Sequence, residues 1–333
     1  MSGHAAAWAQ LLRVSALFTV PGDAVAGAVA AGRLPGRATL LAAGSSLCLY
    51  EAGMALNDWA DRAEDAVERP ERPLPAGRIH PPAALAAATG LTAAGLALAA
   101  RAGRLPLATA GALATTVWAY DLRLKHTPAG PAAMATARAL DILLGATASG
   151  PSTSGPACRT GPRNASPGRA LGAAAFMGTH TLAVTAVSRR EAQGGAPGIP
   201  LAALGAVAAI AAGVTSHRRR STPMTLAATA AYLGTAVRPL THAALNPSPQ
   251  LLQRAVGGGI RAMIPLQAAL IARAAAAPGA QPSPAPPGTA PPGGGPPRRL
   301  SRMTWDGRGA GYASALLALV PLARRLSRKV SPT

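Results

Sequence analysis

Long apolar runs separated by short polar segments make up most of this chain. Each run is about as long as the roughly 20 residues that a helix needs to cross the hydrocarbon core of a bilayer. About nine such runs are predicted to be membrane-spanning helices: residues 8–31, 38–57, 82–101, 104–121, 131–149, 169–187, 200–216, 223–241 and 256–274. Many are rich in Ala and Gly, and small residues allow helices to approach closely. We therefore expect an all-α, polytopic membrane protein.

Three stretches break the apolar pattern and define the expected domains. Residues 150–169 are rich in Pro, Gly and Ser and are predicted to be a flexible connector. A Pro/Gly-rich segment, 275–308, is predicted to be a disordered linker. The basic tail 309–333 contains an apolar stretch that is short for a membrane span, so we expect an interfacial helix. Residues 1–274 are then the transmembrane domain.

The composition supports a bilayer rather than a nucleic acid as the partner. Hydrophobic residues make up 49% of the 333 residues and charged residues 13%, whereas soluble proteins usually have about 25% charged residues. Lys and Arg number 32 against 12 Asp and Glu, which gives a net charge of +20. These basic residues are scattered between apolar runs, and aromatic residues are only 3%, too few for base stacking. We expect no nucleic-acid partner and Arg anchors at lipid headgroups.

The expected location is the bacterial inner membrane. No basic region precedes the first apolar run, so no cleavable signal peptide is predicted. The abundance of Ala, Gly, Pro and Arg, with only two Lys, suggests a GC-rich bacterial genome. We place the N-terminus inside the cell because this puts the acidic loop 58–81 in the cytoplasm. The distribution of Arg and Lys between the loops does not decide the orientation.

The loop at 58–81 concentrates acidic residues beside the end of an apolar run. Half of all the acids lie within fourteen residues: Asp58, Asp61, Glu64, Asp65, Glu68 and Glu71. At about 100° per residue, Asp58, Asp61 and Asp65 share one helical face. Carboxylates held together need a compensating cation, and hard oxygen ligands favour Mg²⁺. The alternative is a solvated loop whose acids are balanced by neighbouring Arg residues.

Three segments of the chain resemble motifs of one family. Residues 57–65 (NDWADRAED) resemble the NDxxDxxxD motif of the UbiA superfamily of intramembrane prenyltransferases, which includes 4-hydroxybenzoate polyprenyltransferase. Residues 71–79 (ERPLPAGRI) are similar to its RPLPSGRI-like segment, and residues 120–127 (YDLRLKHT) to its Tyr-x(4)-Lys loop. The resemblance covers roughly residues 8–274. Within the superfamily, the chain looks similar to an actinobacterial branch related to the EboC proteins.

The resemblance implies transfer of a prenyl or polyprenyl group from an allylic diphosphate to a small acceptor, inside a bundle of about nine helices around a central cavity. The implied catalytic residues are Asp58, Asp61, Asp65 and Lys125, of which the three Asp would hold Mg²⁺ on the diphosphate. The implied substrate-binding residues are Asn57, Arg72, Arg78 and Tyr120. The low aromatic content slightly favours a small polar or cyclic alcohol as the acceptor, whose identity the chain does not reveal.

The chain departs from the family where a second acidic motif is expected. The matching stretch, residues 185–195 (TAVSRREAQGG), contains Glu191 as its one acid. We expect Arg189 and Arg190 to bind the diphosphate directly and partly replace the second metal, because guanidinium groups fit phosphate oxygens. A role as a topological anchor is the alternative.

Other functions are compatible with part of the pattern. The CDP-alcohol phosphotransferases also bind metal through spaced Asp residues, but their order of Asp, Gly, Ala and Arg is missing here. A catalytically degenerate family member, or a cation-binding transporter or scaffold, remains the main alternative. Arg138 and Asp141 lie one helical turn apart and are predicted to pair. The six His residues show no metal-ligand spacing and receive no role.

Overall fold

The computed structural model describes residues 3–13, 19–148, 167–190, 194–216, 221–276 and 311–318. All regular structure in these residues is helical. The helices are α1 (Gly3–Leu11), α2 (Val20–Ala30), α3 (Arg37–Ala60), α4 (Arg62–Glu68), α5 (Pro81–Ala102), α6 (Arg104–Ala119), η2 (Tyr120–Leu124), α7 (Gly130–Ala148), α8 (Pro167–Ser188), α9 (Gly198–Thr215), α10 (Pro223–Leu245) and α11 (Pro249–Ala275). Residues 311–318 form one more short helix.

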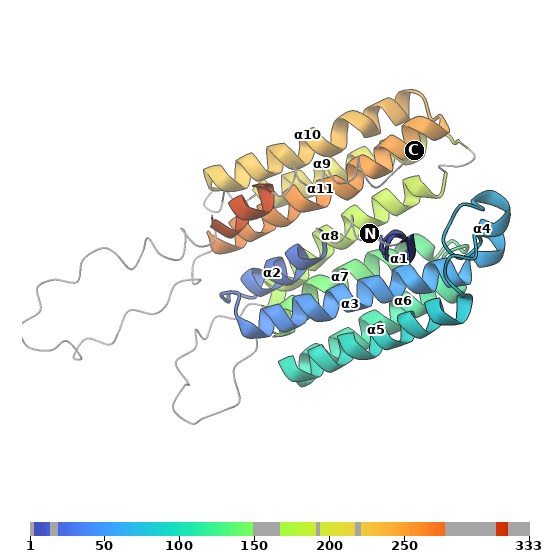
Figure 1. Cartoon of the computed structure of the whole chain (residues 1–333). Coiled ribbons are helices and arrows are strands. Elements are labelled where there is room, and N and C mark those ends of the chain that lie inside the picture. The colour runs from blue at the N-terminus through green and yellow to red at the C-terminus, as the bar shows by residue number, and fades with distance from the viewer. Residues whose placement is uncertain are drawn as a thin grey trace, which may run out of the picture.

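Nine of the described helices, α2, α3 and α5 to α11, run side by side in one elongated bundle (Figure 1). Helix α3 packs against α5, α7 against α8, and α10 against α11, while α2 packs against α7. In the view of Figure 1, α4 projects at the right-hand end of the bundle, beyond the end of α3. The predicted all-α bundle is confirmed.

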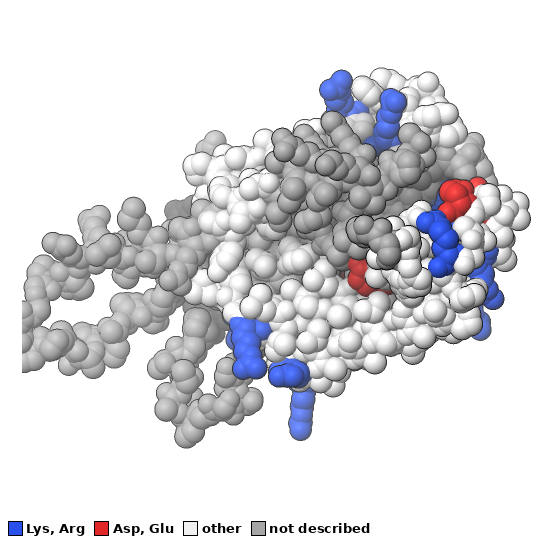
Figure 2. All heavy atoms as spheres, viewed as in Figure 1, with Lys and Arg blue, Asp and Glu red and all other residues white. Residues whose placement is uncertain are grey.

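Five of the helices that the structure describes are long and apolar enough to cross a membrane by length and composition: α3, α5, α8, α9 and α11. Helix α2 has 11 residues and α6 has 16, so both are shorter than these five helices. Most of the described surface in Figure 2 is formed by neither acidic nor basic residues, and charges of both signs meet beside α4 at the right.

The predicted span at residues 8–31 is wrong as a single helix. Helix α1 ends at Leu11, and α2 begins only at Val20, with Thr19 before it and Pro21 in its first turn. A Pro lacks the N–H that a helix interior needs, but it is well suited to the first turn of a helix. Pro21 therefore favours the start of a new helix, α2, rather than one continuous helix over residues 8–31.

The predicted polar loop at 58–81 is ordered by a few buried apolar residues. It contains α4, and Leu74 and Ile79 after it are buried in a cluster with side chains of α1, α3 and α5. Between them, Gly77 has a φ of +69°, a conformation that residues with a side chain rarely adopt. This turn folds the segment back against the start of α5 and fixes the loop at the end of the bundle.

A close contact between α2 and α7 depends on two Gly residues, each of which faces backbone atoms of the opposite helix. A Cβ atom added at Gly145 would lie 2.2 Å from the carbonyl oxygen of Ala24, and one at Gly27 would lie 1.9 Å from that of Ile142. Backbone atoms cannot move aside as side chains do, so these positions allow no larger residue without separating the helices.

We expect Gly145→Ala to destabilise the protein by about 1–3 kcal/mol, because the new methyl group overpacks the α2–α7 contact. Gly172→Ala is the matched control, since Gly172 is also helical but a Cβ there would meet no atom within 4 Å. Thermal unfolding in detergent should show a lower midpoint for Gly145→Ala and an unchanged or higher midpoint for Gly172→Ala. Equal midpoints for both variants would contradict the close packing.

A network of buried polar side chains joins four helices inside the bundle. In α7, Arg138 Nη1 lies 2.7 Å from Asp23 Oδ2 of α2 and 3.9 Å from Asp141 Oδ2. Ser46 of α3 donates a hydrogen bond of 2.5 Å to Asp141, and Gln267 of α11 donates one of 2.8 Å to Asp23. The predicted pair of Arg138 and Asp141 is therefore present, but Asp23 is the nearer partner.

The predicted connector at 150–169 and the linker at 275–308 lie almost entirely outside the described residues. Part of the tail is described, as the helix at 311–318. Its residues Ala313 and Leu316 are buried in the same apolar cluster as side chains of α8 to α11. This short helix therefore packs against the bundle.

Candidate active site

Three segments that are distant in the sequence meet at one end of the bundle. Asn57, near the end of α3, donates a hydrogen bond of 3.2 Å to Asp121 of η2. Asp61, immediately after α3, forms an ion pair with Lys125, immediately after η2. Arg189, after α8, donates a hydrogen bond of 2.7 Å to the carbonyl oxygen of Thr127. The acidic loop, the Tyr-x(4)-Lys segment and the end of α8 thus lie on the same face of the protein.

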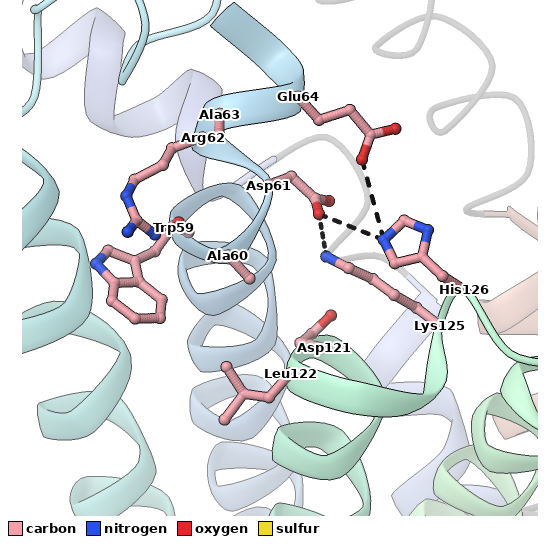
Figure 3. A pocket seen from close by; sticks show the side chains of 10 residues that line it. All are labelled: Trp59, Ala60, Asp61, Arg62, Ala63, Glu64, Asp121, Leu122, Lys125 and His126. Atoms are coloured by element: carbon pink, nitrogen blue, oxygen red, sulfur yellow. Dashed lines mark hydrogen bonds and ion pairs between the residues drawn. The ribbon is translucent and has the colours of Figure 1, made fainter.

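A hollow of about 400 Å³ opens between the first two of these segments (Figure 3). Residues 59–64 line one side, and Asp121, Leu122, Lys125 and His126 line the other. Figure 3 shows the side chains of Asp61 and Glu64 directed towards those of Lys125 and His126. Of the predicted catalytic residues, Asp61 and Lys125 line this hollow.

Two of the three motif acids share one basic group, and the third contacts another. Arg72 Nη1 lies 2.6 Å from Asp65 Oδ2 and 3.5 Å from Asp58 Oδ1, so these two acids converge on one nitrogen atom. Asp61 instead faces Lys125, because α3 ends at Ala60 and α4 begins at Arg62, so that Asp61 occupies the junction. The structure brings Asp58 and Asp65 together as expected from their shared face, but places Asp61 on the adjoining side.

The residues present suit a divalent cation. Asp58 and Asp65 already hold a positive group, the Arg72 guanidinium, at the point where their oxygens converge, and both side chains are buried. Oxygen ligands of this kind, completed by water and phosphate oxygens, are those that Mg²⁺ prefers. Asp58 and Asp65 are therefore side chains of the kind that can hold this ion, and Asp61 lies on the adjoining side.

The segment η2 is a π-helical turn, a rare structure that occurs often at functional sites. Its wide turn is closed by a hydrogen bond of 2.9 Å from the Lys125 N–H to the Tyr120 carbonyl. In η2, beyond the end of α6, Asp121 is buried and accepts the hydrogen bond from Asn57. The turn brings Asp121 against α3 and Lys125 against Asp61.

The predicted Arg residues lie in different surroundings. Arg189 reaches the segment that carries Lys125, through Thr127. The aliphatic part of the Arg190 side chain lies beside Gly195 instead. Arg78 donates hydrogen bonds to Gln10 Oε1 at 2.9 Å and to the Glu71 carbonyl at 2.7 Å, and it does not line the hollow. Glu191 falls outside the described residues.

The sequence motifs did not predict every residue of this site. Arg13 Nη2 lies 3.4 Å from Asp58 Oδ1, although 45 positions separate the two residues. His126 Nε2 lies 3.9 Å from Asp61 Oδ1 and 4.0 Å from Glu64 Oε2. The isolated spacing of the His residues gave no sign of this contact, because it depends on how η2 packs against α3.

The model of the UbiA prenyltransferase family matches residues 16–249 of the chain. The chain belongs to the UbiA prenyltransferase family. UbiA membership, together with the five long apolar helices, identifies a multi-pass membrane protein. The resemblance seen in the three sequence segments is thereby confirmed.

Curated relatives of this UbiA-family chain include two archaeal proteins called digeranylgeranylglyceryl phosphate synthase. The protein of Methanopyrus kandleri is 38% identical over 118 residues, which are 34% of this chain and 41% of the relative. That of Methanothrix thermoacetophila is 39% identical over 108 residues, which are 32% of this chain and 40% of the relative. The matched region thus spans about two fifths of the length of these relatives.

Solved structures of UbiA homologues share the fold. The apo structure of a homologue from Aeropyrum pernix K1 has a TM-score of 0.60 at 18% identity and covers 77% of this chain and 96% of that one. A homologue from Archaeoglobus fulgidus, bound to DMAPP and Mg²⁺, has a TM-score of 0.54 at 16% identity, with 77% and 98% covered. At these identities the likeness concerns the fold alone.

Proposed function

We propose that this chain transfers a prenyl or polyprenyl group from an allylic diphosphate to a small acceptor within the membrane, with Mg²⁺ as the cofactor. The observation that carries the proposal is the meeting of carboxylates and cations at one end of an apolar bundle. Asp58 and Asp65 converge there, and Asp61 and Lys125 face the adjoining hollow. Such a site suits a ligand with a charged head and an apolar tail. The binding of DMAPP and Mg²⁺ by the Archaeoglobus homologue supports the same class of substrate.

The basic side chains of the site have a clear role in this reaction. The allylic C–O bond breaks, and its electron pair leaves with the diphosphate, so negative charge grows on the leaving group. Lys125 and Arg72 contact the acids, and Arg189 contacts the segment that carries Lys125; these cations would stabilise that charge. Bound Mg²⁺ would supply further stabilisation of the same charge. The acceptor atom then donates an electron pair to the allylic carbon and releases a proton.

The acceptor class is best tested with alcohols. The archaeal relatives take their name from a prenylated glyceryl phosphate, and the low aromatic content of this chain also favours an alcohol over an aromatic ring. We further propose a bacterial inner membrane as the location, on the basis of the amino-acid composition. Asn57 and Tyr120 would position substrate at the junction of α3 and η2.

The test is a transfer assay with the full-length protein in lipid nanodiscs. A radiolabelled prenyl diphosphate is supplied with glyceryl phosphates, cyclic alcohols or 4-hydroxybenzoate, and labelled lipid is measured with Mg²⁺ or with excess chelator. We expect Mg²⁺-dependent product with one alcohol class. Retention of the intact diphosphate under all conditions, by protein that is demonstrably folded, would favour a catalytically silent or transport function.

Arg189→Ala and Arg190→Ala form a matched pair that tests which cation meets the diphosphate. Removal of Arg189 should cost about 1.5–3 kcal/mol in kcat/KM, the value of a charged hydrogen bond, mainly through a higher KM for prenyl diphosphate. Arg190→Ala should change kcat/KM much less, since this side chain lies along Gly195. Steady-state kinetics on correctly inserted protein measures both. Equal losses would contradict the assignment.

A further inference from the structure

The buried polar network around Arg138 has one sealed side and one side with accessible surface. The side chain of Asp23 is fully buried and holds Arg138 Nη1 at 2.7 Å. The side chains of Arg138 and Asp141 keep 13% and 8% of their surface exposed. Their contacts are nevertheless with Asp23 of α2, Ser46 of α3 and Met263 of α11. The exposed parts of Arg138 and Asp141 therefore face the interior of the bundle.

The network lies at a depth that suits a molecule bound beside the diphosphate. Helix α7 begins at Gly130, where an added Cβ atom would lie 2.9 Å from the carbonyl oxygen of Lys125. Arg138 and Asp141 follow on the same helix, about 12 and 16 Å further along its axis at 1.5 Å per residue. This separation from the hollow is comparable to the length of an allylic carbon followed by a small acceptor.

Acids outnumber basic groups in this part of the bundle. Asp23 already balances the charge of Arg138, and Asp141 adds a second carboxyl group. Glu51 of α3 is buried as well, and neither of its carboxyl oxygens has a hydrogen-bond partner among the described residues. Tyr50, beside it, interacts electrostatically with both Glu51 and Arg138. Burying a carboxylate without donors is costly, so these surroundings disfavour a phosphate and favour a ligand that brings hydrogen-bond donors.

We propose that Arg138, Asp141 and Tyr50 bind the hydroxyl groups of an uncharged polyol, which is the acceptor of the transfer reaction. A hydroxyl group both donates and accepts, which matches a guanidinium donor beside a carboxyl acceptor. Tyr50 lies one helical turn from Ser46 and so shares its face of α3. Ser46 positions Asp141 through its hydrogen bond of 2.5 Å. The assignment rests on the proposed function and narrows its acceptor to an alcohol without a phosphate group.

The test compares acceptors that differ only in charge, using the full-length protein in nanodiscs. Glycerol, glycerol phosphate, inositol, inositol phosphate and inosamine are each supplied with the radiolabelled prenyl diphosphate and Mg²⁺. Saturation-transfer NMR measures binding of the same five compounds without turnover. We expect the wild type to bind and prenylate glycerol or inositol in preference to the corresponding phosphate and to the amine.

Asp141→Asn should raise KM for the polyol by at least about 10-fold, the effect of losing a charged hydrogen bond. The KM for prenyl diphosphate should stay unchanged, because Asp141 lies away from the leaving group. Removing one negative charge should also shift the ratio of polyol to phosphate transfer towards the phosphate by about 10-fold. This ratio does not depend on the amount of folded protein, so a purely structural role of Asp141 would leave it unchanged.

Ser46→Ala and Ser45→Ala form a matched pair that keeps the test possible if Asp141→Asn is not recovered folded. Both hydroxyl groups are buried on successive residues of α3, but Ser45 Oγ has no hydrogen-bond partner among the described residues. Ser46→Ala should raise KM for the polyol several-fold, as expected for the loss of one hydrogen bond, and Ser45→Ala should not change it.

The outcomes separate this site from the proposed function. An active wild type that prefers a phosphate or the amine, or whose preference ignores both Asp141 and Ser46, would overturn this site alone. Folded wild type that binds neither glycerol nor inositol would also overturn it. Polyol binding that depends on Asp141, without any transfer of the prenyl group, would support the site and count against the proposed function.

Discussion

Asp61→Ala is expected to lower prenyl transfer by about 10³-fold in folded protein, with Asp58→Ala and Asp65→Ala causing smaller losses of at least about 10²-fold. In the proposed reaction, charge stabilisation of the departing diphosphate would depend on cations held by these acids, and loss of a single stabilising group commonly costs about 10²–10³-fold in kcat. Asp61 is expected to show the largest effect, because it both lines the hollow and holds Lys125. Initial rates of labelled product formation measure the loss.

Glu68→Gln is the control for these three variants. Glu68 ends α4, is exposed, and lies in the same acidic loop, so a general effect of loop charge would lower its rate as well. The variant should retain the wild-type rate. If all three Asp variants kept rates near the wild type with the metal chelated, the metal-dependent mechanism would be wrong.

Arg138→Met is expected to destabilise the protein by about 3–5 kcal/mol, the usual cost of breaking a buried ion pair by removing one partner. The substitution preserves much of the side-chain length but leaves Asp23 and Asp141 inside the bundle without their cation. Their remaining partners, Gln267 and Ser46, donate hydrogen bonds but carry no charge. Thermal or denaturant unfolding in detergent measures the change.

Arg101→Met is the matched control for this prediction, because Arg101 is exposed in the last turn of α5. It should change stability by no more than about 0.5 kcal/mol. If Arg138→Met cannot be recovered as folded protein, Arg138→Lys, which keeps the charge but has fewer donors, should give a smaller and measurable loss. If Arg138→Met were as stable as the wild type, the network would not be what holds the four helices together.

The positions of the helices could be predicted well because a bilayer demands long apolar segments. The runs at 38–57 and 82–101, for example, correspond to α3 and α5. The first predicted span failed because hydrophobicity alone does not register the effect of Pro21 on helix continuity. Only part of the network around Arg138 could be predicted from the sequence. Asp141 is a local neighbour, but Asp23 lies 115 positions away and meets Arg138 through packing of α2 against α7.

The residues of the candidate site also fall into two groups: those whose proximity follows from their spacing in the sequence, and those that meet only through packing of distant segments. The spacing of Asp58, Asp61 and Asp65 is local, so their common neighbourhood could be predicted from the helical repeat. The contacts of Arg13 with Asp58 and of His126 with Asp61 join separate segments. No sequence pattern within one segment predicts these two contacts. They form because the bundle brings the chain near α1, α3 and η2 together.

The π-helical turn in η2 gives a geometric reason for the number of residues between Tyr120 and Lys125. On a regular α-helix, residues five positions apart point about 140° away from each other. In η2 the hydrogen bond from the Lys125 N–H to the Tyr120 carbonyl stacks these two residues one above the other. Deleting one of the four intervening residues would restore ordinary helical winding, and it would rotate the ammonium away from Asp61. The length of this spacer, more than the identity of its residues, therefore directs Lys125 towards Asp61.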